Sequence, residues 1–135
     1  MSEFFQNIDI ERELNKFPFV QILSSEDSKK KGAPKYNQII TCWNAYTEVH
    51  NNHDENPSAW ICTDGEKKGL AYCPRCKEGG TIFDVITGYR IRENIIADLQ
   101  NWTKDDVLKE VKHYLINKYR CGADGEEGGT VASLV

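Results

Sequence analysis

The sequence predicts a small α+β domain in which an antiparallel β-hairpin is flanked by helices. The chain has 135 residues, which is enough for one domain with a modest core. Two short apolar and aromatic segments, "SAWICT" and "GLAYC", flank the turn "DGEKKG", as expected for a hairpin. Apolar residues at helical spacing between positions 107 and 119 predict a helix after the hairpin.

The N-terminal part of the chain combines a helical pattern with a polar segment. Residues 8–24 have the apolar content of a packed helix, which Pro18 is expected to interrupt or restart. The next segment, "SSEDSKKKGAPK", is polar and contains Gly32 and Pro34, so we expect a loop. The β-branched and aromatic residues of "NQIITCW" and "AYTEV" then predict two short strands.

The segments on either side of the hairpin differ in character. "HNNHDENP" is rich in residues that favour turns, so no regular structure is expected there. The glycines of "CKEGG" permit the left-handed backbone of a tight turn. Thr81 and Asp84 then have capping-box spacing and predict a helix over "TIFDVITGY". "RENIIADLQ" predicts a second short helix, and Thr103 with Asp106 predicts the start of a longer one.

These elements divide the chain into four consecutive regions. Residues 1–45 are expected to form an N-terminal helical segment, a basic loop and a first strand. Residues 46–90 hold the hairpin and its flanking turns, and residues 91–121 supply C-terminal helices that pack on this core. Residues 122–135 are rich in glycine, and we expect a disordered tail.

Composition and charge argue against several functional classes. No apolar run approaches the roughly 18 residues of a membrane span, and the acidic N-terminus lacks the basic end of a signal peptide. We therefore expect a cytoplasmic protein whose cysteines are reduced or metal-bound. The formal net charge of −4 argues against a general nucleic-acid binder. Bases nevertheless outnumber acids between residues 60 and 92, and "SKKKGAPK" forms a second basic island.

Two pairs of metal-ligating residues bracket the hairpin. His50 and His53 are separated by two residues, as are Cys73 and Cys76. This spacing lets one turn present two side chains to the same ion, and zinc prefers four such ligands in a tetrahedron. Because the hairpin brings the two pairs together, the sequence predicts a zinc ribbon that binds Zn²⁺.

Other interpretations of these residues stay open. Cys42, in an apolar strand, is an alternative ligand in place of His50, or a buried free thiol. The histidines are alternatively solvated loop residues, and "CPRC" is alternatively a buried thiol pair. "CPRC" also resembles the redox-active C-P-x-C motif of glutaredoxins, but that motif needs a helix directly after Cys73, where "KEGG" stands. We expect Cys62 and Cys121 to be packing or surface thiols and His113 to be exposed.

Residues 46–90 combine these motifs in a distinctive order. The first half reads "AYTEVHNNHDENPSAWI" and the second half reads "LAYCPRCKEGGTIFDVI". In this order they resemble the N-terminal zinc-binding domain of bacterial and phage DNA primases. In that family a Cys-Pro-x-His knuckle precedes a hairpin, a Cys-x-x-Cys pair and a helix. Here His50 stands where the family has its first cysteine, and the spacing from His53 to Pro57 is shorter than usual.

The resemblance implies binding of a single-stranded DNA template and assistance to primer initiation in DNA replication. Trp60 and Tyr72 are candidate stacking platforms for bases, or alternatively close the small core against the following helix. The candidate phosphate contacts are Lys67, Lys68, Arg75 and Lys77.

The resemblance does not extend to a catalytic domain. Nothing after the hairpin resembles the carboxylate cluster with which a primase catalytic domain holds two metal ions. We therefore expect the chain to be non-catalytic alone and to act with a primase catalytic domain or another replication protein. The alternative function is a zinc-stabilised module for protein–protein interaction without DNA binding, and a thiol oxidoreductase is a third.

Overall fold

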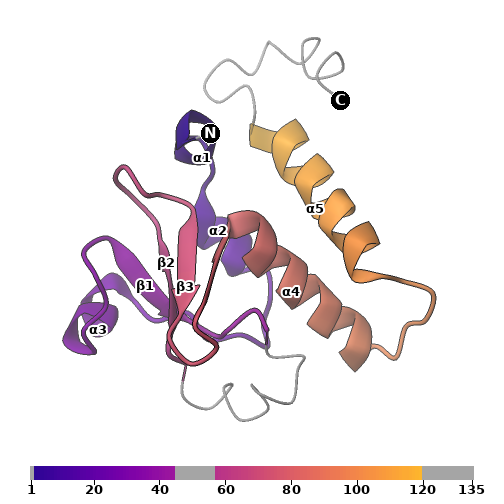
Figure 1. Ribbon diagram of the computed structural model, residues 1–135, viewed down its shortest axis with the longest axis horizontal. Helices are drawn as coiled ribbons and strands as arrows, with labels where there is room; N and C mark the ends of the chain where they lie inside the picture. Colours follow the sequence, from indigo (N-terminus) through magenta and orange to yellow (C-terminus); the bar gives the residue numbers. More distant parts are fainter. Residues whose placement is uncertain (1, 45–56, 120–135) are drawn as a thin grey trace.

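The computed structural model of the protein describes residues 2–44 and 57–119. These residues form an α+β domain in which a four-stranded antiparallel sheet is followed by two helices (Figure 1). The predicted α+β class and the predicted hairpin are therefore confirmed. The strand expected over "AYTEV" and the tail over residues 122–135 lie outside the described residues.

The four strands pair in sequence order, so the sheet is a simple meander. In the predicted hairpin, Trp60 of the second strand lies opposite Tyr72 of the third. The described part of the loop between the first two strands ends at Asn44 and resumes at Pro57. The strands are β1 (Asn37–Ile40), β2 (Ala59–Cys62), β3 (Leu70–Cys73) and β4 (Glu78–Thr81).

The last strand was not expected from the sequence. Gly79 and Gly80 lie in β4 and pair with β3, so the prediction that they supply a left-handed turn is wrong. The left-handed residue is Lys77, with φ 57°, and its backbone N–H donates to the carbonyl of Cys73 at 2.8 Å. The turn is therefore complete within the Cys-x-x-Cys pair and one further residue, and the glycines are free to extend the sheet.

The N-terminal region is more broken than the helical pattern suggests. The helices are α1 (Ser2–Gln6) and α2 (Ile10–Leu14), so a helix over residues 8–24 is wrong beyond Leu14. Further along, Ile22 forms an isolated bridge with Ile40 of β1. The apolar residues of this region therefore reach the core through short helices and an extended segment.

The polar segment predicted as a loop contains a helix, α3 (Ser25–Lys30). The side chain of Ser24 caps it by accepting from the backbone N–H of Asp27 at 3.1 Å. Acidic residues occupy its first turn and lysines its last, which suits the helix dipole. The Oγ of Ser28 accepts from the backbone N–H of Ile39 at 2.8 Å, so α3 is held against the edge strand β1.

Two long helices complete the domain, α4 (Ile82–Ile96) and α5 (Lys104–Tyr119). The predicted capping box is present, with Thr81 and Asp84 bonded reciprocally at the start of α4. The two short helices predicted after it are one continuous helix. Gly88 lies inside it because the helix passes close to Trp43: a Cβ at Gly88 would lie 2.0 Å from the carbonyl oxygen of Trp43.

The core lies between one face of the sheet, α4 and the N-terminal helices. Buried residues of β3 alternate with outward-facing ones, so Ala71 and Cys73 are buried while Leu70 and Tyr72 are exposed. α5 packs against α4, side by side with it in Figure 1. None of the described helices is long and apolar enough to span a membrane.

A buried carboxylate ties α5 to α2. Glu13 is 2 % exposed and accepts hydrogen bonds from Lys118, Tyr114 and Tyr119. Lys16 forms a further ion pair with it at 3.2 Å. Burial alone raises the pKa of this carboxyl, but these donors outweigh burial and lower the pKa to about 2. The group therefore stays ionised and fixes the C-terminal helix to the N-terminal region.

Candidate metal centre

Three cysteine side chains gather at one end of the sheet. Cys42 follows β1, Cys73 ends β3, and Cys76 lies in the turn between β3 and β4. Their sulfur atoms all lie within 4.8 Å of one another, and those of Cys42 and Cys76 are 3.6 Å apart. Sulfur ligands at about 2.3 Å from a tetrahedral zinc ion are about 3.8 Å apart. The cluster therefore has the spacing of a metal site and could hold an ion such as zinc.

The antiparallel sheet places these residues together. The C-terminal ends of β1 and β3 lie at the same end of the sheet, because β2 runs between the two strands in the opposite direction. The tight turn after β3 then folds Cys76 back beside Cys73. Cys42 and Cys73 are completely buried and Cys76 is partly exposed, so the site opens to solvent on the side of the turn.

Asn44 links two of the cysteines. Its backbone N–H donates to the Sγ of Cys42 at 3.3 Å, and its side-chain Nδ2 lies 3.6 Å from the Sγ of Cys76. The same Nδ2 donates to the carboxylate of Glu78 at 2.7 Å, which fixes the orientation of the amide. Donors of this kind stabilise the negative charge of thiolate ligands and orient them.

The three thiols share their ionisation unequally. The hydrogen bond from Cys42, helped by N–H groups of the following turn, lowers the pKa of Cys73 to about 5. The same contact and burial raise the pKa of Cys42, and burial raises that of Cys76. The hydrogen bonds among the thiols thus favour ionisation of Cys73 over that of its two neighbours. A bound cation would favour loss of the remaining protons, because metal ligation requires the thiolate form.

The predicted ligands are only partly within the described residues. Cys73 and Cys76 belong to the cluster, together with Cys42, which the sequence offered as an alternative ligand. His50 and His53 lie outside the described residues. The chain leaves the described region at Asn44, in contact with the cluster, and returns shortly before β2 at the same end of the sheet.

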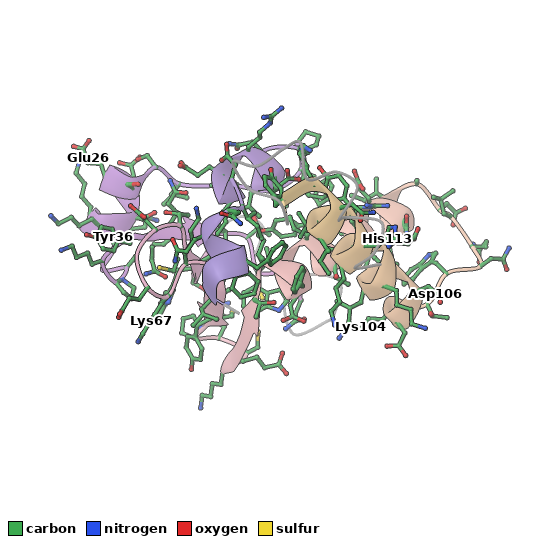
Figure 2. The ribbon with its side chains drawn as sticks, turned by 90° about the horizontal axis from the view of Figure 1, so that it is seen from above. Glu26, Tyr36, Lys67, Lys104, Asp106 and His113 are labelled. Atoms are coloured by element: carbon green, nitrogen blue, oxygen red, sulfur yellow. The ribbon has the colours of Figure 1, made fainter. Side chains whose placement is uncertain are left out.

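Cys62 and His113, which were not predicted as ligands, lie away from the cysteine cluster. Cys62 is buried near the opposite end of the sheet, and its thiol donates to the carbonyl of Asp64 at 2.9 Å. His113 is exposed on α5, as predicted, and Figure 2 shows it near the end of the molecule that also holds Lys104. Cys121 lies outside the described residues.

The predicted aromatic platforms lie on the outer face of the sheet. The ring centroids of Trp60 and Tyr72 are 5.6 Å apart, and neither ring belongs to the buried core. The candidate phosphate contacts form two groups. Arg75 and Lys77 are exposed in the turn that carries the cysteines. Lys67 and Lys68 are at the far end of the hairpin, where the Nζ of Lys68 donates to the carbonyl of Gln6 at 3.0 Å.

The third cysteine of the cluster had a weaker sequence signal than the other two. Cys42 lacks a cysteine or histidine partner at short spacing, so its place depends on the pairing of β1 with β2. One sequence signal could have identified Cys42. In any meander of this order, the strand "NQIITC" ends at the same end of the sheet as the Cys-x-x-Cys turn. Comparisons with protein-family models, with curated proteins and with solved structures give no match for this chain, so its chemistry is indicated by the geometry of the cluster.

Proposed function

We propose that the protein is a zinc-stabilised module that binds single-stranded DNA and assists a primase catalytic partner. One observation carries the proposal: the cluster of Cys42, Cys73 and Cys76 lies at the end of the strands that present Trp60 and Tyr72 on an open face. A cluster of soft thiolate ligands suits structural zinc, and a partly exposed aromatic pair beside cations suits single strands.

The proposed zinc site has three cysteine ligands and one histidine. Thiolates favour zinc over the hard cations that carboxylates prefer. The fourth ligand is proposed to come from His50 or His53, because their segment joins residues at both sides of the cluster. Four protein ligands leave no open position for a substrate, so the ion stabilises the fold and takes no part in a reaction.

The proposed DNA surface is the outer face of the hairpin and the adjoining turn. Bases stack on Trp60 and Tyr72, while Arg75 and Lys77 contact phosphates. The acidic net charge of the chain keeps such binding local and sensitive to salt. Primer synthesis itself is assigned to a catalytic partner, with this module holding the template.

Metal counting tests the first half of the proposal. Native mass spectrometry of the purified chain is expected to show one zinc ion per chain, and none in Cys42→Ser. Only one of the variants His50→Ala and His53→Ala is expected to lose the metal, which identifies the fourth ligand. A chain without bound zinc, or a Cys42→Ser variant that keeps it, would contradict the proposed site.

Fluorescence anisotropy with a short labelled oligothymidylate tests the second half. Trp60→Ala is expected to weaken binding about 10-fold, because stacking on an aromatic ring contributes about 1–3 kcal/mol per base. Leu70→Ala is the matched control, since Leu70 is an exposed non-aromatic residue on β3. Zinc binding without any DNA binding would reject this half.

The second candidate is a protein-interaction module, favoured by an apolar patch. Ile95, Ile96 and Leu99 are 50 %, 62 % and 56 % exposed at the C-terminal end of α4 and just beyond it. Large apolar side chains that cluster on a surface commonly mark contact sites. A replication partner that binds this patch is compatible with either function, so the oligonucleotide experiment decides between them.

A further inference from the structure

A cleft of about 880 Å³ lies at the end of the sheet opposite the cysteine cluster. Its walls are the start of α2, the helix α3, the turn before β1 and the turn of the β2–β3 hairpin. Figure 2 shows Tyr36 at this end of the molecule with Glu26 and Lys67, far from His113 on α5. The residues that matter chemically are Asp9, Glu11, Lys29, Lys35, Tyr36 and Lys68.

Tyr36 occupies a backbone position that normally requires glycine. The backbone N–H of Asn37 donates to the carbonyl of Pro34 at 3.0 Å, which closes a β-turn with Tyr36 as its third residue. Tyr36 has φ 66°, whereas the third position of such a turn favours glycine or asparagine. The backbone is held there because Thr63 donates twice to the carbonyl of Tyr36, at 2.9 and 3.2 Å. Strained backbone conformations of bulky residues are typical of functional sites, so the side chain of Tyr36 is a candidate for ligand contact.

The ring of Tyr36 is held in place yet remains accessible. It rests on Gly65 in the hairpin turn, where an added Cβ would lie 3.0 Å from the ring. The Nζ of Lys35 lies 4.9 Å from the ring centroid. The residue is nevertheless 51 % exposed. A fixed and exposed ring with a cation beside it can stack a planar ligand that also carries negative charge.

The cleft is lined by both lysines and carboxylates, and this combination limits the chemical class of ligand that it can bind. Three lysines line it, and one of them, Lys68, already donates a hydrogen bond to the carbonyl of Gln6. Three carboxylates also line it, and each already accepts a hydrogen bond within the protein: Asp9 caps α2, Glu11 accepts from Gln38 at 3.0 Å, and Asp64 accepts from the backbone N–H of Gly65 at 2.8 Å. Lysines suit a phosphate, and carboxylates accept hydrogen bonds from the amino groups of bases.

We propose that this cleft binds one nucleotide unit with an amino-bearing base. The base stacks on Tyr36, the carboxylates accept from its amino group, and Lys29 and Lys35 contact the phosphate. A free nucleotide and one residue of a single strand share this chemistry. The site is separate from the aromatic pair on the outer face of the sheet and requires no metal, so it does not depend on the proposed function.

Amide NMR spectra of the isotope-labelled full chain, titrated with adenosine monophosphate or with a short oligodeoxyadenylate, test the proposal. We expect shifts around residues 34–37 and 63–68. Tyr36→Gly is expected to weaken binding about 10-fold. Glycine suits the backbone at this position, so this variant is expected to fold. Tyr36→Phe keeps the ring and is expected to bind normally, and Lys104→Gln on α5 is the charge control.

The two probes identify the source of the nucleotide. Loss of affinity for adenosine monophosphate in Tyr36→Gly indicates a free nucleotide, and loss for the oligomer alone indicates a strand. Unchanged affinity for both probes in Tyr36→Gly would overturn the proposal, as would equal binding of inorganic phosphate and adenosine monophosphate. Trp60→Ala affects oligomer binding on the outer face only, so failure of the proposed function is recognised separately.

Discussion

Two buried polar clusters hold this domain together, and they neutralise negative charge in different ways. Glu13 is met by Lys118 and Lys16, so cations of the chain balance its carboxylate. The sulfur of Cys73 is met by the Cys42 thiol and by backbone N–H groups, which lower the pKa of Cys73. The first cluster is complete with Lys16 and residues of α2 and α5, whereas the second has the sulfur ligands and the spacing for an added cation. This difference distinguishes a structural ion pair from a candidate metal site.

Both clusters join segments that are far apart in the sequence. Glu13 connects to Tyr119 across almost the whole described chain, and Cys42 connects to Cys76 across the hairpin. Neither connection is a matter of local propensity, because short helices and strands of this size are marginal alone. Each cluster therefore fixes a part of the tertiary structure that the hydrophobic core leaves less determined. Removing either cluster should lower the free energy of unfolding.

The largest effect is expected from the cysteine cluster. Cys73→Ser should abolish metal binding and lower the free energy of unfolding by several kcal/mol, because structural zinc contributes folding energy directly. Native mass spectrometry and thermal unfolding measure the two effects. Cys62→Ser is the matched control, since Cys62 is also buried on the same sheet but lies outside the cluster, and it should cost about 1 kcal/mol. Equal effects of the two variants would remove the distinction between the cysteines.

A smaller effect, visible in acid, is expected from Glu13. Its pKa is about 2 in the folded state against 4.5 as its ordinary value. A lowered pKa gives stability that is complete above about pH 4.5 and is lost as the pH falls toward 2. At pH 3 the loss relative to neutral pH should be about 2 kcal/mol.

Urea unfolding between pH 7 and pH 3 measures this loss, at fixed ionic strength. Glu13→Gln should remove that part of the pH dependence, since an amide does not titrate. Glu93→Gln is the control, because the pair of Glu93 with Arg90 is exposed and contributes little. A pH dependence unchanged in Glu13→Gln would show that other carboxyls dominate the acid response.

Local signals predicted the parts of the fold that depend on neighbouring residues. The capping box of Thr81 with Asp84 marked the start of α4, and the apolar segments around "DGEKKG" marked β2 and β3. α3 was missed because its stability comes from a cap and from the contact of Ser28 with β1, which a polar composition does not reveal. α4 was predicted as two helices, whereas it continues through Gly88, where Trp43 packs too close for a residue with a Cβ.

The candidate metal centre was predictable to a similar extent. The short spacing of Cys73 and Cys76 identified them from the sequence alone, since a tight turn is a local structure. Cys42 could be placed only with the register of β1 against β2, which is a long-range property. The residues that orient the sulfurs, Asn44 and Glu78, carried no sequence signal because they meet only when the segment after β1 reaches the start of β4.

The smallest effect is expected from Asn44→Ala, which tests whether the cysteine cluster is tuned by its surroundings. The variant removes the amide contacts with Cys76 and Glu78 but keeps all three thiols and the backbone donor to Cys42. Outer contacts of metal ligands typically affect affinity by 10- to 100-fold, and the retained backbone bond places the expected loss near the lower figure, at about 10-fold. Competition with a chromogenic zinc chelator measures it, and Glu78→Gln, which keeps an acceptor for Asn44, should change affinity much less. If Asn44→Ala binds zinc as tightly as the unaltered chain, the thiols alone define the site. The cysteine cluster would then resemble the Glu13 cluster less, since several donors of that cluster hold one charge together.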